Sequence, residues 1–164
     1  NASATALRQA WRQATTDGEK IILFRVAAKR KLRSFVPLLT PLLHAPESSY
    51  DLRWYAADTL GDIGSPAAGP AVLAAYQAEA EPAMRSMFAS VLGGVRYPPA
   101  IPELIAGLQS DNSYERKNAA WSLGALHATE AQPALAAALE EETNDSAQQW
   151  MWEALQRLTS ATSA

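Results

Sequence analysis

The residues that could carry chemistry in this sequence are few and widely scattered. His44 and His127 stand far apart, cysteine is absent, and no His-x-x-x-His or other metal-ligand spacing occurs. Acidic residues fall in predicted loops and at helix ends, so no carboxylate pair can be assigned to acid–base catalysis. Gly93-Gly94 is too short for a phosphate-binding loop, and no serine has an evident catalytic partner. We therefore predict no catalytic residue, no cofactor site and no metal site.

Four cationic residues recur at almost constant spacing and could bind either anions or structural carboxylates. Lys20, Arg53, Arg85 and Arg116 follow one another at intervals of 33, 32 and 31 residues. We favour a structural ladder, in which the aliphatic stems pack and the charged groups bind neighbouring helix ends or carboxylates; an anion site is the alternative. The separate basic run from residue 29 to residue 33 could bind an acidic partner or phosphate, although a solvated turn is the simpler interpretation.

The same spacing extends to uncharged residues and defines an internal repeat. Each clear copy carries an Arg, a Leu-Gly pair and a Pro, namely Arg53, Leu60, Gly61 and Pro70, then Arg85, Leu92, Gly93 and Pro102, then Arg116, Leu123, Gly124 and Pro133. A period of this length with two helical segments per copy is typical of a helical solenoid. We predict an all-α, right-handed α-solenoid of about four to five helix pairs. We expect one domain over residues 1–164, with copies at 3–16, 18–46, 49–79, 81–110, 112–141 and 145–159 and a disordered tail.

Ten helices are predicted from the 3.6-residue periodicity of apolar positions. Leu60, Leu92 and Leu123 are expected in the core, and Gly64 is expected in the left-handed position just after a helix. The helix predicted from Ser34 to Ala45 contains two prolines and should therefore start late or be kinked.

Composition narrows the function classes. The 164 residues carry a net charge of −3, which argues against a general nucleic-acid-binding protein because such a protein needs a cationic face. No apolar run approaches the ~18–20 residues of a membrane span. The default expectation is therefore a cytoplasmic protein without a membrane partner.

The repeat register separates surface from core and gives a first set of candidate binding residues. Two repeat positions on the first helix are polar in most copies and are therefore expected to face water. Trp54 aligns with Ser86, Lys117 and Gln149, and Trp121 aligns with Asp58, Ser90 and Glu153. We predict that both are exposed on the outer helix layer, where aromatic side chains are enriched at binding hot spots. The alternative is that each ring lies flat on its own repeat.

The second helix of each pair gives the other set, because such helices are expected to line the concave side. Its outward positions are predicted to be small, which would admit a partner helix or strand closely; the alternative is that small residues only permit tight curvature. The candidates on this face and its polar edge are Ala74, Ala75, Glu103, Ala106, Gly107, Gln109 and Glu140. Nearby Glu79 and Glu142 would suit a basic partner, or form a solvated acidic edge.

The segments Leu52–Tyr76 and Tyr114–Leu139, with a weaker copy at Met84–Leu108, resemble the HEAT-repeat superfamily and in particular its phycobilisome-lyase-type HEAT-like repeats. The shared pattern is an Arg, then Ala-Ala, then Leu-Gly, then a helix that begins near a Pro. The resemblance implies a scaffold for protein–protein contacts, and some relatives act in chromophore attachment to bilin-carrying proteins. Fold alone does not transfer that activity.

We therefore predict a non-catalytic scaffold that binds another protein or peptide on its concave face or at its exposed tryptophans. The alternative is a lyase-like or maturation-factor subunit that presents a prosthetic group with the help of a second subunit.

Overall fold

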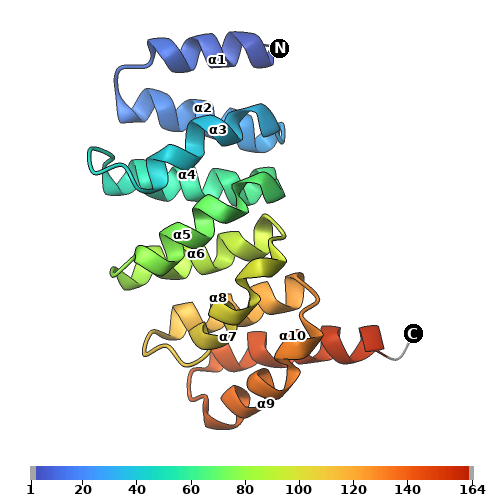
Figure 1. The fold of residues 1–164 in the computed structure, drawn as a ribbon. Helices are drawn as coiled ribbons and strands as arrows, with labels where there is room; N and C mark the ends of the chain where they lie inside the picture. Colours follow the sequence, from blue (N-terminus) through green and yellow to red (C-terminus); the bar gives the residue numbers. More distant parts are fainter. Residues whose placement is uncertain (1–2, 163–164) are drawn as a thin grey trace.

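The computed structural model describes residues 3–162 and forms an elongated stack of helices (Figure 1). Asn1, Ala2, Ser163 and Ala164 lie outside the described residues. The described part contains ten α-helices, and the predicted all-α solenoid is confirmed. The α-helices are α1 Ala4–Gln13, α2 Asp17–Lys29, α3 Val36–Leu39, α4 Tyr50–Ile63, α5 Gly69–Ala78, α6 Pro82–Gly94, α7 Ile101–Gly107, α8 Ser113–Ala125, α9 Gln132–Glu141 and α10 Asp145–Thr162.

The helices form two layers. In the first layer α2, α4, α6, α8 and α10 stack directly on one another down the molecule. The second layer consists of α3, α5, α7 and α9, each packed against first-layer helices (Figure 1). The solenoid grows because a single helix pair leaves apolar faces uncovered, and the next pair covers them.

Helix ends follow local sequence signals. The Ser49 hydroxyl caps α4 by accepting a hydrogen bond from the Leu52 amide at 3.1 Å, and Thr16 and Glu19 form a reciprocal capping box at α2. Gly64 ends α4 with a φ of 65°, as predicted. The tail was expected to be disordered from Ser160, but α10 continues to Thr162.

Short 3-10 turns introduce the second-layer helices, and sequence periodicity did not show them. They are η1 Arg33–Phe35, η3 Pro66–Ala68, η4 Pro98–Ala100 and η5 Thr129–Ala131, with η2 Thr40–Leu43 following α3. The predicted Ser34–Ala45 helix is divided into η1, α3 and η2, with Pro37 in the first turn of α3 and Pro41 in the first turn of η2. A 3-10 turn has three residues per turn, so each one shifts the register of the helix behind it.

The core runs the length of the stack. Leu60, Leu92 and Leu123 are all fully buried, as predicted from their repeat position. First-layer backbones approach closely at the ends of α4 and α6, because a Cβ atom on Gly94 would lie 3.2 Å from the Gly61 Cα. None of the helices between residues 3 and 162 is long and apolar enough to cross a membrane.

Candidate protein-binding groove

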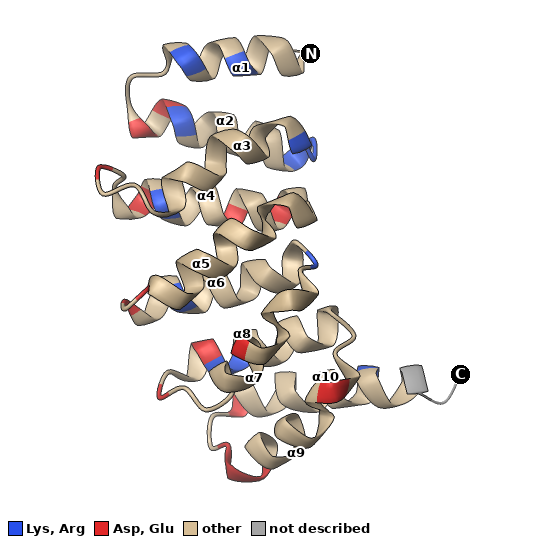
Figure 2. Cartoon of the chain, in the orientation of Figure 1, with Lys and Arg blue, Asp and Glu red and all other residues tan. Residues whose placement is uncertain are grey.

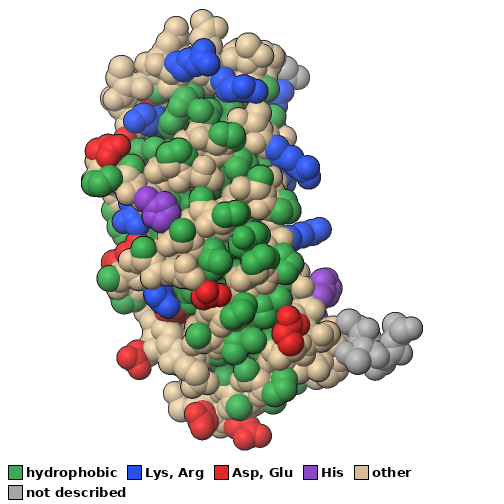
Figure 3. Space-filling view, viewed as in Figure 1, with side chains coloured by type: hydrophobic (Ala, Val, Ile, Leu, Met, Phe, Trp, Pro, Cys, Tyr) green, Lys and Arg blue, Asp and Glu red, His purple; other side chains and the backbone are tan. Residues whose placement is uncertain are grey.

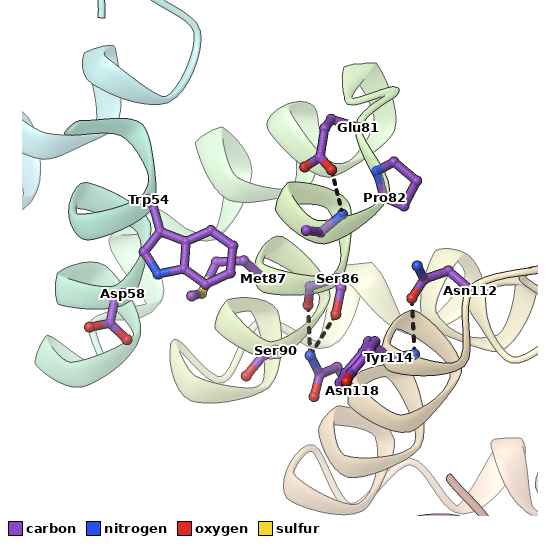
Figure 4. Close-up of a pocket in the computed structure, with 11 residues that line it drawn as sticks. Trp54, Asp58, Glu81, Pro82, Ser86, Met87, Ser90, Asn112, Tyr114 and Asn118 are labelled. Atoms are coloured by element: carbon purple, nitrogen blue, oxygen red, sulfur yellow. Dashed lines mark hydrogen bonds between the residues drawn. The ribbon is translucent and has the colours of Figure 1, made fainter. Parts of the chain in front are cut away.

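A hollow on the outer face of the first layer crosses α4, α6 and α8 (Figure 4). It has a volume of about 540 Å³. Trp54 and Asp58 form the α4 wall, Met87 lies on the α6 floor, and Tyr114 and Asn118 form the α8 wall.

A second hollow of about 180 Å³ continues the first one along α6. The two share Asp58, Met87 and Ser90, and the second one extends to Asp62 and Trp121. We call the combined depression the groove. Its α6 residues Pro82, Ser86, Ser90 and Gly94 recur every fourth position. At 1.5 Å per residue the groove therefore follows α6 for about 18 Å.

Hydrogen bonds across the helices fix the shape of the groove. The Asn118 side-chain amide on α8 donates to the Ser86 carbonyl at 3.0 Å and to the Ser86 hydroxyl at 2.9 Å. The Glu81 carboxylate caps α6 by accepting from the amides of Ala83 and Met84 at 3.1 and 2.7 Å. The polar groups of these side chains therefore form hydrogen bonds within the fold.

Other groove side chains keep free polar groups. Among the residues that the structure describes, the Trp54 indole N–H, the Asp58 carboxylate and the Ser90 hydroxyl have no hydrogen-bonding partner. Partial burial raises the pKa of Asp58 above its usual value, and the negative charge of Asp62 raises it further. The groove thus offers an N–H donor, a hydroxyl and an exposed carboxylate between its aromatic walls.

The recurring arginines lie at the edge where each second-layer helix leads into the next first-layer helix, and carboxylates lie beside them (Figure 2). Arg53 pairs with Glu79 and donates to the Leu43 carbonyl at 3.1 Å. Arg116 binds both carboxylate oxygens of Glu142, at 2.6 and 2.7 Å. These pairs hold neighbouring helix ends together, which is the geometry that a structural ladder requires.

Arg85 belongs to a hydrogen-bond network within this ladder. Its Nε donates to Glu115 at 2.7 Å, and its guanidinium lies 4.5 Å from the centre of the Tyr76 ring. Tyr76 donates its hydroxyl to the same Glu115 oxygen at 2.6 Å, and Ser110 donates to the other oxygen at 2.8 Å. Glu115 is only 2% exposed, so this network links α5, α6 and α8 through a satisfied buried charge.

Lys20 does not continue the ladder. Its Nζ lies 3.9 Å from Asp17 within the same helix and 5.8 Å from the centre of the Trp11 ring. The prediction of a fourth ladder member at this position is wrong, because the carboxylate beside Lys20 comes from its own helix and not from the next repeat.

A family model described as HEAT repeats matches residues 69–156, and a second one, described as a PBS lyase HEAT-like repeat, matches residues 52–78. The chain belongs to the HEAT-repeat family. The resemblance found in the sequence is thereby confirmed. No curated protein matches the chain.

Two solved structures resemble the fold of this chain. The complex of CpcE and CpcF of phycocyanin lyase from Nostoc matches with a TM-score of 0.78 and 19% identity, covering 98% of this chain and 66% of the matched chain. Human deoxyhypusine hydroxylase in complex with glycerol matches with a TM-score of 0.64 and 23% identity, covering 79% of this chain and 45% of the other. The HEAT-repeat chain thus spans just under two thirds of the length of the phycocyanin lyase chain.

The two tryptophans predicted to be exposed are in fact half-buried. Trp54 stacks on Tyr50 with a centroid separation of 6.0 Å and packs against the core. Trp121 lies over Gly93, since a Cβ atom there would be 2.8 Å from its ring. The alternative interpretation of the sequence, in which each ring packs against its neighbours, describes both side chains better than an exposed position does. Each ring nevertheless lines the groove.

The predicted small-residue face belongs to the second layer, where apolar side chains gather (Figure 3). Ala74 and Ala106 are exposed there, but Ala75 and Gly107 are buried. A Cβ atom on Gly107 would lie 2.7 Å from the Tyr76 hydroxyl, so its small size serves close packing. The prediction that Ala75 and Gly107 face a partner is wrong, and the hollow across α4, α6 and α8 lies on the opposite layer.

Some side chains of the predicted polar edge of this face already form hydrogen bonds or ion pairs within the protein. Gln109 and Glu140 are exposed, whereas Glu103 is half-buried and accepts a hydrogen bond from the Gln77 amide at 2.6 Å. Glu79 and Glu142 are the ladder carboxylates, so they do not form a free acidic edge.

Sequence reasoning missed Tyr114, Met87 and Asn118 as groove residues. Tyr114 is 66% exposed and is a large apolar side chain open to water beside the groove. The repeat register did place Asp58, Ser90 and Trp121 at one outward position, which is the signal that points to this surface. Among the described residues no cluster of His, Asp and Glu is arranged to hold a metal ion.

Proposed function

We propose that this HEAT-repeat chain is a non-catalytic binding module that holds a segment of another protein in the groove between Trp54 and Tyr114. The observation that supports this most is the groove itself, which crosses three successive first-layer helices and leaves the polar groups of Trp54, Asp58 and Ser90 free. Pockets with aromatic walls and a few convergent polar groups are typical ligand sites.

The shape of the groove favours a polypeptide. It follows α6 for about 18 Å, which is the length of about five residues of extended chain. Its floor offers Met87, and methionine adapts to differently shaped partners. A segment lying along α6 would contact three helices of the array at once.

A site-specific crosslinker tests this proposal. A photoreactive benzoylphenylalanine replaces Met87 in one variant and Ala74 in another, and each is irradiated in a lysate of the source cells. We expect a protease-sensitive crosslinked product at position 87 that is absent at position 74. Crosslinking at position 74 alone would move the binding face to the second layer and refute the proposal.

A second candidate function is that of a lyase-like or maturation-factor subunit. It is supported by the match of almost the whole chain to the phycocyanin lyase complex, which contains two different subunits. In this case the chain would present a pigment to its acceptor together with a second chain. Absorbance spectra of the purified protein mixed with a linear tetrapyrrole test it, and an unchanged pigment spectrum with and without a candidate second chain would leave the first proposal alone.

A further inference from the structure

The groove has a one-sided charge. Three of its side chains, Asp58, Asp62 and Glu81, are carboxylates, and no Lys or Arg lines either of its two hollows. Lys117 lies at the α8 wall, where its Nζ is 5.3 Å from the centre of the Tyr114 ring, and it pairs with none of these three carboxylates. A partner that enters the groove therefore meets a negative surface.

The groove carboxylates differ in how many hydrogen bonds they accept from the protein. Glu81 uses its oxygens to cap α6 and to accept from Tyr50 at 3.4 Å. Asp58 accepts no hydrogen bond from any described residue, and both its partial burial and the neighbouring Asp62 disfavour its charged form. A cation placed beside Asp58 would relieve this unfavourable electrostatic environment.

The aromatic wall next to Asp58 is also free. Four other aromatic side chains of the described structure hold a cation over their rings, namely Trp11, Tyr55, Tyr76 and Tyr114. Trp54 stacks on Tyr50 but has no such cation, although it lines the acidic groove (Figure 4). Tryptophan is the aromatic side chain that attracts cations most strongly.

We propose that the occupant of the groove is a basic peptide segment of a partner protein, with a Lys or Arg side chain lying over Trp54 and paired with Asp58. This inference rests on the proposed function, because it names the chemistry of the segment that the groove binds. Charge complementarity across the groove would speed encounter and select the partner, and the paired carboxylate and indole would fix one cationic side chain at a defined place.

The inference is tested with peptides selected from a random display library on the immobilised wild-type protein. Affinities of the selected peptides are measured by fluorescence anisotropy for the wild type and three variants. Ser90→Trp fills the groove floor whatever the occupant's chemistry. Asp58→Asn removes the free charge, and Glu130→Gln is the matched control because it removes an exposed carboxylate outside the groove. Circular dichroism establishes that all variants remain helical.

We expect selected peptides enriched in Lys and Arg, whose binding is abolished by Ser90→Trp. Asp58→Asn should weaken them about fivefold to tenfold, and Glu130→Gln should leave the affinity within about twofold of wild type. Peptides that depend on Ser90 but lack basic residues would overturn the basic-segment inference while keeping the groove as the site. Basic peptides indifferent to Asp58→Asn would overturn the pairing with Asp58. Peptides indifferent to Ser90→Trp, or a failure to select any, would overturn the proposed function itself.

Discussion

The Leu-Gly pair of each repeat gives a prediction in which chemically identical substitutions have different outcomes. Gly61 and Gly93 occupy the same repeat position, near the ends of α4 and α6. A Cβ atom on Gly61 would meet Val91 at 3.5 Å, an ordinary contact. A Cβ atom on Gly93 would lie 2.5 Å from the Ser122 hydroxyl and 2.8 Å from the Ser122 Cα, which is backbone and cannot swing away.

The free-energy difference between the two variants can be worked out. Alanine is favoured over glycine inside helices by up to about 1 kcal/mol, and both variants gain this term. Gly61→Ala should therefore stabilise the protein by about 0.5–1 kcal/mol. Gly93→Ala adds an overpacking cost of about 1–3 kcal/mol, so it should be less stable than Gly61→Ala by that amount.

Urea unfolding followed by circular dichroism measures this difference. Gly124→Ala is an internal control, because its Cβ atom would lie 3.3 Å from the Ala154 Cα and so should rank between the other two. Equal stability of Gly61→Ala and Gly93→Ala, or a reversed order, would refute the packing described for the first layer.

Three further predictions concern the ladder edge and the turns. Hydrogen bonds from Arg116 hold the pKa of Glu142 at about 2, below its ordinary value of 4.5. This difference in pKa between the folded and the unfolded chain stabilises the fold by about 3 kcal/mol. The stabilisation is present above pH 4.5 and is lost as the pH falls towards 2. Glu142→Gln should thus be destabilised at neutral pH and should approach wild type in acid, which unfolding curves across this range would show; a gap independent of pH would contradict the assignment. Tyr76→Phe removes the hydroxyl bound to Glu115 and should cost about 1–2 kcal/mol in urea unfolding; an unchanged midpoint would show that the network is unimportant. Arg96 has a φ of 55°, which favours glycine, so Arg96→Gly should raise the thermal midpoint by a few degrees, an increase of about 1 kcal/mol in stability, and a lower midpoint would indicate an essential role of the arginine side chain.

The repeat made most of the fold predictable. Buried leucines at one repeat position and prolines at another identify which helix of a pair is which, and Gly64 marks a helix end by its conformational freedom. These signals depend only on nearby residues in the sequence, so they can be interpreted without knowing which helices lie next to one another.

The residues whose burial was predicted wrongly from the sequence are those whose surroundings depend on contacts between repeats. Ala75 and Gly107 look like surface residues because they are small, but the 3-10 turns shift their helices and direct both towards the core. Ser86 is polar at a position expected to face water, yet it is buried by Asn118 of the next repeat. The type of a residue alone does not indicate which residue of the next repeat packs against it, so its burial cannot be predicted from the sequence.

The groove could be predicted only in part for the same reason. The register identified Trp54 and Trp121 as outward positions of the first helix, and both line the groove. The hollow itself arises from how α4, α6 and α8 stack, and Tyr114 joins it from a position near the start of α8 that carried no repeat signal.

We propose that the first-layer groove, and not the small-residue face of the second layer, holds the partner. The most direct measurement compares the affinity of one crosslinked and identified partner for two matched variants, Ser90→Trp in the groove and Ala74→Trp on the second layer. We expect that Ser90→Trp abolishes binding, while Ala74→Trp leaves the affinity within about twofold of wild type. Retained binding by Ser90→Trp together with its loss in Ala74→Trp would contradict it.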